Sequence, residues 1–294
     1  MRAKDYEKVS TLEANDVLLI DGDRGVKTIS PKTIHKQLLD ETTNAEYWKR
    51  VNEFCNGSPN PACIRKQFYR GKQLGTSFTD VHKAAIRSGK FDDMFIGDYW
   101  TINGRLWAIS DFNYWLKKGD TRCETSHVLI IPNNNLYTHV MNDTNTTEGG
   151  YAGSKMFSSG GLNQAYTMLS SDFGSSNLLT HRELFTNAVT NGRPSNGNWY
   201  DSNVTLMNEF MVYGHSVFSP ANDGSNILYN YTIDINQLAI FRLRPELQNS
   251  QRSWYWLRDV VSAANFAVVH GGGHADYNGA SGAAGVRPVC GIIG

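Results

Sequence analysis

The stretch SWYWLRDVVSAANFAVVHGGGHADYNGASGAAGVRPVCGII, residues 253–293, combines two kinds of sequence. Apolar and aromatic runs stand at its two ends. Between them lies a segment rich in Gly and Ala, with isolated His, Asp, Tyr and Asn. The runs predict short strands, and the segment between them predicts irregular connections. We consider three roles for this segment: a metal-binding loop, a phosphate-binding loop and a displayed binding surface.

Short strand-like runs recur through the rest of the chain. Two aromatic runs flank Asn103-Gly104, a dipeptide typical of β-hairpins. HVLIIP at 127–132 predicts a buried strand, and LAIFRLRP at 238–245 predicts another. Long connections rich in Asn and Gly separate these runs, which indicates extensive irregular structure.

Helical patterns are fewer than strand-like ones in this part of the chain. Apolar residues at helical spacing predict a helix over 160–174. THRELFTNAVTNG, residues 180–192, predicts a second helix, because Thr180 and Glu183 match a capping box. Short strands with few helices predict a mixed α+β fold.

Three regions are predicted along the chain: 1–45, 46–90 and 91–294. The first contains DVLLIDGDRGVKTIS, which predicts two strands joined by a turn, and a short helix is expected at 30–42. This unit is too small to hold a core alone, so we expect it to attach to a partner or to its own copies. The second region is interpreted as a linker. It contains two predicted helices, NAEYWKRVNEF and SFTDVHKAAIRSGKF, and the latter is expected to end at Gly89. The third region is the main domain.

Composition and charge argue against several classes of function. Lys and Arg number 28, as do Asp and Glu, so the formal net charge is zero and no nucleic-acid partner is expected. No apolar run is long enough to span a membrane, and no signal peptide is predicted. The four cysteines are expected to be free thiols, although a local disulfide is left open for the close pair; they are Cys55, Cys63, Cys123 and Cys290.

The Gly-rich segment does not match the motifs of catalytic or metal sites. His270 and His274 are four residues apart, but a loop does not fix two rings on one side, so no metal site is predicted. HGGGHADYNG lacks the Lys of a phosphate loop, and no helical pattern follows it. The chain contains no GxSxG elbow and no Cys in the context of a nucleophile. We therefore predict no cofactor and no enzymatic activity.

Five motifs follow one another along the chain and together resemble one known family. They are GDYWTINGRLWAISDF, HVLIIPNNNLYTHVMNDTNTTEGGYAGSKM, LLTHRELFTNAVTNG, WYDSNVTLMNEFMVYG and YWLRDVVSAANFAVVHGGGHADYNGASGAAGVRPVCGI. The chain resembles the variable proteins of diversity-generating retroelements in gut bacteriophages and prophages, which are related in fold to phage major tropism determinants. The resemblance covers about 91–294, and it extends more weakly through the segments from ANDVLLIDGDRGVKTIS to RKQFYRGKQLGTSFT.

The resemblance implies a fold and a division of the C-terminal region into fixed and varied positions. The implied fold is a C-terminal C-type lectin fold of the formylglycine-generating-enzyme type, with a variable region at about 254–294 and a small β-rich and helical attachment region at the N-terminus. Fixed positions are implied at Phe266, Ala267, Val269, Gly273, Ala275, Ala280, Ser281 and GVRP. Varied, ligand-binding positions are implied at Val268, His270, Gly271, Gly272, His274, Asp276, Tyr277, Asn278, Gly279, Gly282 and Ala284, with Asn265 as a weaker candidate. We expect the displayed side chains to share one face of the protein, and Phe266 and Val286 to point inward.

The resemblance also implies a function. The protein would be a non-enzymatic receptor-binding protein, made in the bacterial cytoplasm and displayed on the phage tail tip. It would form a homotrimer, contact other tail proteins and bind a bacterial surface protein or glycan. Three alternatives stay open: a structural tail protein without a ligand, a surface lectin of a bacterial cell, for which no secretion signal is predicted, and an oxidase of the formylglycine-generating type. The oxidase would need a reactive cysteine pair, for which Cys123 and Cys290 are the candidates in the domain.

Overall fold

The chain divides into two compact units, Met1–Phe54 and Cys55–Gly294. The computed structural model describes residues 17–21, 25–29, 45–186, 189–190, 193–194, 197–219 and 234–294. In the first unit, strands β1 (Val17–Asp21) and β2 (Gly25–Ile29) pair antiparallel, which confirms the predicted strand–turn–strand. The helix predicted at 30–42 lies outside the described residues.

The larger unit contains two large sheets. The first has six strands in the order β12-β17-β6-β5-β4-β3. Neighbouring strands are antiparallel, except that β3 runs parallel to β4. The predicted hairpin is confirmed, because Asn103 and Gly104 turn the chain between β4 and β5 with φ of 49° and 76°. The strands are β3 (Gln73–Gly75), β4 (Tyr99–Ile102), β5 (Arg105–Phe112), β6 (Val128–Pro132), β12 (Val204–Leu206) and β17 (Pro288–Ile292).

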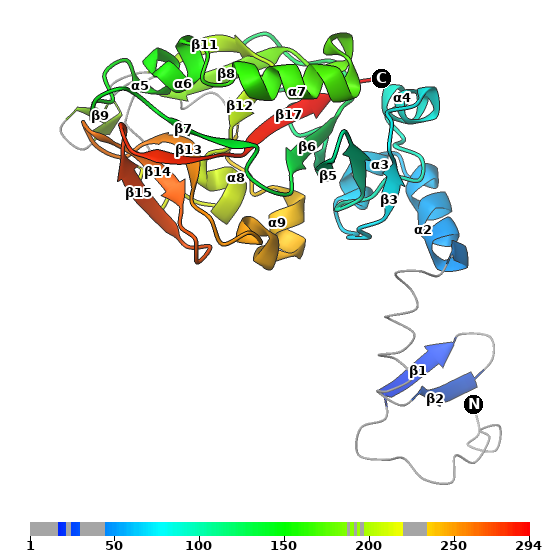
Figure 1. Ribbon diagram of the computed structural model, residues 1–294. Coiled ribbons are helices and arrows are strands. Elements are labelled where there is room, and N and C mark those ends of the chain that lie inside the picture. Colours follow the sequence, from blue (N-terminus) through cyan, green and yellow to red (C-terminus); the bar gives the residue numbers. More distant parts are fainter. Residues whose placement is uncertain are drawn as a thin grey trace. The chain divides into compact units, whose positions relative to one another are not determined.

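The second large sheet has five strands in the order β15-β14-β13-β16-β7, so that β15 lies at one edge and β7 at the other. Its strands are β7 (Tyr137–Val140), β13 (Tyr255–Val260), β14 (Asn265–Val269), β15 (Ala275–Gly279) and β16 (Ala283–Val286). Residues 253–293 thus supply four strands of this sheet, together with β17 of the other sheet (Figure 1). The segment predicted as irregular connection is therefore partly strand, at β15 and at the start of β16, and turn elsewhere.

The chain passes from one sheet to the other at Arg287, between β16 and β17. The guanidinium is buried and donates to backbone carbonyls, among them Pro132 O at 3.0 Å and Gln248 O at 2.7 Å. A buried cation is tolerated when its donors are satisfied in this way. Arg287 therefore fixes the position at which the two sheets meet.

Short helices surround the sheets. Helix α7 confirms the prediction for 160–174, and α4 starts at the N-cap Thr79 and ends before Gly89, as predicted. Helix α7 contacts β5, because Trp107 Nε1 donates to Asp172 Oδ2 at 2.7 Å. Among the described residues, no helix has the length and the apolar character needed to cross a bilayer. The helices are α2 (Ala45–Gly57), α3 (Pro61–Arg65), α4 (Asp80–Arg87), α5 (Gly150–Gly153), α6 (Lys155–Ser158), α7 (Asn163–Phe173), α8 (Glu209–Tyr213) and α9 (Ala239–Leu243), with the 3-10 turns η1 (Ser175–Asn177) and η3 (Pro245–Asn249).

Two predicted elements have the opposite type in the structure. The segment with the capping-box pattern forms β8 (His181–Thr186), which pairs with β11 (Gly197–Ser202), and a two-stranded ribbon of β9 (Val189–Thr190) and β10 (Arg193–Pro194) follows β8. LAIFRLRP is not a strand, because α9 and η3 begin within it. The α+β class itself is confirmed.

The segment predicted as a linker contributes to the larger unit from Cys55 onwards. Strand β3 adds to the six-stranded sheet, and the buried Arg70 pairs with the buried Asp98 at the start of β4. This pair is satisfied by several hydrogen bonds, including Arg70 Nε to Asp98 Oδ1 at 3.0 Å. These contacts place the segment within the compact unit.

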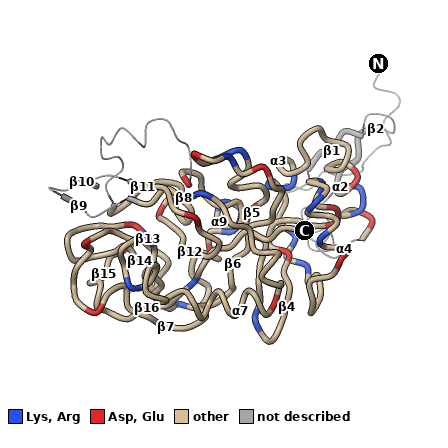
Figure 2. Tube along the Cα trace, turned by 90° about the horizontal axis from the view of Figure 1, so that it is seen from above, with Lys and Arg blue, Asp and Glu red and all other residues tan. Residues whose placement is uncertain are grey.

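Two clusters of buried apolar side chains cover the two faces of β14. Ala267 and Val269 belong to the larger cluster, whereas Phe266 and Val268 belong to a smaller one that contains Trp256. Successive side chains of a strand point to opposite faces, so β14 is covered on both sides. Figure 2 shows acidic and basic residues interspersed along the described part of the chain, without a continuous basic stripe.

A candidate binding site on the β14–β15 hairpin

The Gly-rich segment forms the turn of a β-hairpin. Strands β14 and β15 pair antiparallel along their whole length. Across the turn, His270 N–H donates to His274 O at 2.9 Å, and Gly273 N–H donates to His270 O at 2.8 Å. Gly273 has φ of +90°, a value that favours glycine. The Tyr213 hydroxyl donates to Gly273 O at 3.2 Å and ties the turn to α8.

Strand pairing decides which side chains of the hairpin share a face. His270 lies opposite His274, and Asp276 lies opposite Val268. Because side chains alternate along a strand, these residues lie on one face and Tyr277 lies on the other. Tyr277 instead meets Phe218, with ring centroids 5.3 Å apart. Our expectation of a single display face is therefore wrong.

The positions implied to vary differ in their exposure. Val268 and Ala284 are buried in the smaller apolar cluster, so they belong to the frame and cannot contact a ligand. Exposed positions are Gly272, His274 and Tyr277, and half-buried ones are Asn265, His270, Gly271, Asp276, Asn278, Gly279 and Gly282. As expected, Phe266 and Val286 are fully buried.

Three of the glycines implied to vary have little room for a side chain. A Cβ atom at Gly271 would lie 2.9 Å from the backbone carbonyl oxygen of Arg252. At Gly279 it would lie 2.6 Å from Asn145 Oδ1, and at Gly282 it would lie 2.7 Å from Asn278 Nδ2. The two amide side chains can move aside, whereas a backbone carbonyl cannot without a shift of the chain. Gly271 is thus the most constrained of the three.

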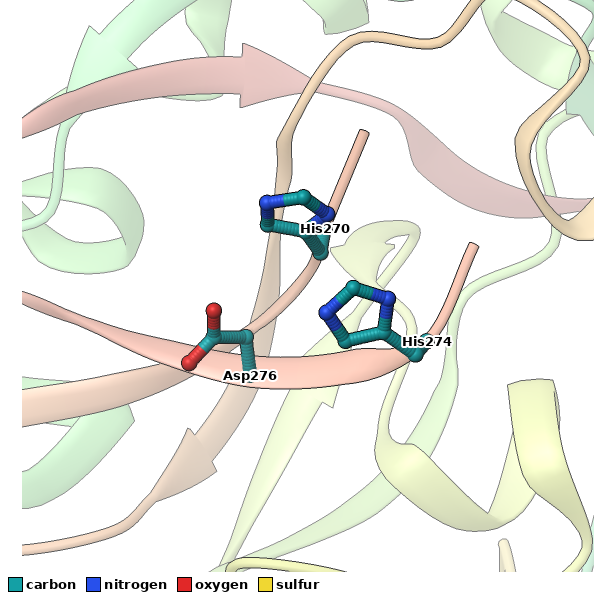
Figure 3. Close-up of side chains that lie close together, drawn as sticks. All are labelled: His270, His274 and Asp276. Carbon is teal, nitrogen blue, oxygen red and sulfur yellow. The ribbon is translucent and has the colours of Figure 1, made fainter. Parts of the chain in front are cut away.

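The two histidines and Asp276 form a cluster on one face of the hairpin. The rings of His270 and His274 stack with centroids 4.2 Å apart and planes inclined by 26°, and Trp254 lies 4.4 Å from the His270 ring. One ligand atom from each of His270, His274 and Asp276 lies within 4.8 Å of the other two (Figure 3). Our reason for expecting no metal site was that a loop leaves the two rings unaligned. The hairpin removes that reason by aligning them.

A second polar cluster, which the sequence did not indicate, is enclosed between β8 and β13. The Arg258 guanidinium contacts Asp234 Oδ2 at 2.6 Å and Glu183 Oε2 at 3.2 Å, and His181 Nε2 lies 2.9 Å from Glu183. Burial and the Glu183 carboxylate raise the pKa of Asp234 to about 7, and burial lowers the pKa of His181 to about 4. All four side chains are buried, so this cluster joins strands and does not present a site.

The cysteines are free thiols, including Cys55 and Cys63. Cys290 is buried on β17, and burial raises the pKa of its thiol. Burial also raises the pKa of the half-buried Cys123. A nucleophilic cysteine requires the opposite shift, because the thiolate is the reactive form.

Comparisons of the chain with protein-family models, with curated proteins and with solved structures found no match. The class of the protein is therefore defined by its fold and by the hairpin. It is a mixed α+β protein. The hairpin at one edge of its five-stranded sheet carries polar and aromatic side chains. The inner strand of that hairpin, β14, is covered by apolar side chains on both faces.

Proposed function

We propose that this protein is the receptor-binding protein of a bacteriophage or prophage, diversified by a retroelement and built on a C-type lectin fold of the formylglycine-generating-enzyme type. The observation that carries the proposal is the contrast between β14 and its continuation. Phe266 to Val269 are buried, whereas the turn and the edge strand β15 carry the exposed His274 and Tyr277. A display surface needs such a division, because its side chains must change without loss of the fold.

The proposed contact residues offer chemistry suited to recognition. Tyr277 and Phe218 expose 46% and 41% of their surface and form an aromatic pair. Tyrosine provides contact area at low entropic cost. His270, His274 and Asp276 provide polar contacts on the other face of the hairpin. The glycines between them keep the contact area of one copy small, so several copies on one particle would raise the avidity.

The proposed setting follows from the resemblance. The protein is made in the bacterial cytoplasm and assembles as a homotrimer on the tail tip. Its N-terminal region contacts other tail proteins, and the hairpin binds a protein or glycan on the bacterial surface.

A cell-binding experiment tests the proposal. Fluorescently labelled full-length protein is incubated with a panel of gut bacteria, and binding is measured by flow cytometry. We expect Tyr277→Ala to reduce binding to any strain that the wild type binds. The matched control is Tyr166→Ala on α7, because Tyr166 is similarly exposed at 38%. The proposal fails if no strain binds the protein, or if the two variants bind as the wild type does.

The neighbouring DNA gives an independent test of the diversification. We expect a near-copy of the 3′ end of the gene beside a reverse-transcriptase gene, with differences concentrated at adenines. Because Val268 and Ala284 are buried, their codons should be spared, while those of His274 and Tyr277 should differ between the copies. Differences spread evenly over the buried and the exposed positions would contradict the division described above.

A further inference from the structure

We propose that His270, His274 and Asp276 bind a divalent transition-metal ion, represented by Zn²⁺. Their candidate ligand atoms already lie within 4.8 Å of one another. Tetrahedral zinc with bonds of about 2.0–2.1 Å holds its ligand atoms roughly 3.3 Å apart. The three side chains therefore need to approach by about 1.5 Å at most. Rotation of the exposed His274 ring can supply much of this movement.

The backbone fixes the arrangement before any metal binds. His270 and His274 face each other across the turn through the bond from His270 N–H to His274 O. Asp276 follows His274 by two residues and so lies on the same face of β15. The bond from Tyr213 to Gly273 O holds the tip of the turn. A metal at this position would need side-chain rotation but no rearrangement of the chain.

The donor set selects the class of ion. Two imidazoles and one carboxylate suit zinc and its neighbours among the divalent transition metals, whereas Ca²⁺ and Mg²⁺ prefer oxygen ligands alone. Asp276 accepts a hydrogen bond from Tyr277 N–H at 2.8 Å, and no described Lys or Arg forms an ion pair with it. Its charge is therefore available to a cation.

Metal binding requires one change of hydrogen bonding at the turn. Gly272 N–H donates to His270 Nδ1 at 2.9 Å, which places the proton of the neutral ring on Nε2. The Nδ1 atoms of both rings face Gly272, and Figure 3 shows the other nitrogen of each ring on the side of Asp276. Binding through Nε2 of His270 moves the ring proton to Nδ1 and breaks the bond from Gly272. The Gly272 amide thus gives a local signal of metal binding.

This inference does not depend on the proposed function, because metal binding is measured without any bacterial ligand. Tag-free full-length protein is titrated with ZnCl₂ at neutral pH by isothermal calorimetry. We expect saturable binding of one ion per chain and no comparable binding of Ca²⁺ or Mg²⁺. His274→Ala and Asp276→Asn should each weaken the affinity at least about tenfold, since loss even of groups that orient ligands costs that much. Titration with Co²⁺ should give visible absorption that is lost in the same variants.

His139→Ala is the matched control, because His139 lies on β7 at the opposite edge of the five-stranded sheet. Its zinc affinity should equal that of the wild type. His274 is exposed, so its replacement leaves the core intact, and far-UV circular dichroism checks the fold of each variant. The proposal is overturned if zinc does not bind saturably, or if His274→Ala and Asp276→Asn bind zinc as tightly as His139→Ala does.

Discussion

Val268 is the position at which burial and the implied pattern of variation disagree most sharply. A varied position must accept polar as well as apolar side chains, so Val268→Asn asks whether this buried position tolerates a polar residue of similar size. Tyr277→Asn places the same residue on the neighbouring strand β15, where the side chain is 46% exposed. We expect the first variant to lose stability and the second to keep it.

The expected loss follows from the surroundings of Val268. Its side chain is 0% exposed and packs in the cluster of Trp256 and Phe266. Loss of a buried valine costs about 1.5–3 kcal/mol. An unpaired amide in its place adds about 1–3 kcal/mol. Val268→Asn should therefore lower the free energy of unfolding by roughly 2.5–6 kcal/mol, whereas Tyr277→Asn should lower it by less than about 1.5 kcal/mol, the value of an aromatic pair.

Urea unfolding followed by tryptophan fluorescence measures both variants. If Val268→Asn does not fold, Val268→Ala extends the series, because it removes the apolar contact without adding an amide and should cost about 2 kcal/mol. Equal unfolding midpoints for the Val268 and Tyr277 variants would refute the reasoning, since they would mean that burial at Val268 contributes no more than the exposed contact of Tyr277.

Two further predictions concern pH and the turn. His127 is buried, with Nδ1 2.9 Å from Thr125 O and Nε2 accepting from Trp115 N–H, and burial lowers its pKa to about 3. The unfolded chain binds a proton near pH 6.5 that the folded state excludes, so the stability contribution of His127 is complete above pH 6.5 and falls by about 1.4 kcal/mol per unit toward pH 3. Urea titrations at several pH values measure this. Between pH 6.5 and 4.5 the free energy of unfolding of the wild type should fall, relative to that of His127→Gln, at that rate. If the two free energies fell in parallel with pH, the reasoning would be contradicted. Gly271→Ala should lower the free energy of unfolding by about 1–3 kcal/mol through the contact with Arg252 O, and Gly272→Ala by less; equal thermal midpoints would argue against a constraint at Gly271.

Local sequence patterns predicted the correct secondary structure where the tertiary contacts favoured the same structure. Asn103-Gly104 predicted its hairpin because both residues adopt the positive φ that the turn demands. Thr180 and Glu183 matched a capping box, yet the segment is a strand. Glu183 is buried against Arg258, and β8 pairs with β11 over six residues. The pairing with β11 and the ion pair with Arg258, which lies far along the chain, overrode the local pattern.

The cluster of His270, His274 and Asp276 could likewise not be predicted before the pairing of its strands was known. Two histidines four residues apart lie together on a helix, whereas a loop was expected to leave the rings of His270 and His274 unaligned. A second geometry gives the same proximity. When three residues form the turn of a hairpin, positions four apart lie directly opposite each other, as His270 and His274 do. Three consecutive glycines permit that turn, and the carboxylate two positions further on then falls on the same face. The spacing HGGGHAD therefore specifies a cluster once the strands on both sides are recognised, and it specifies nothing while the segment is interpreted as a loop.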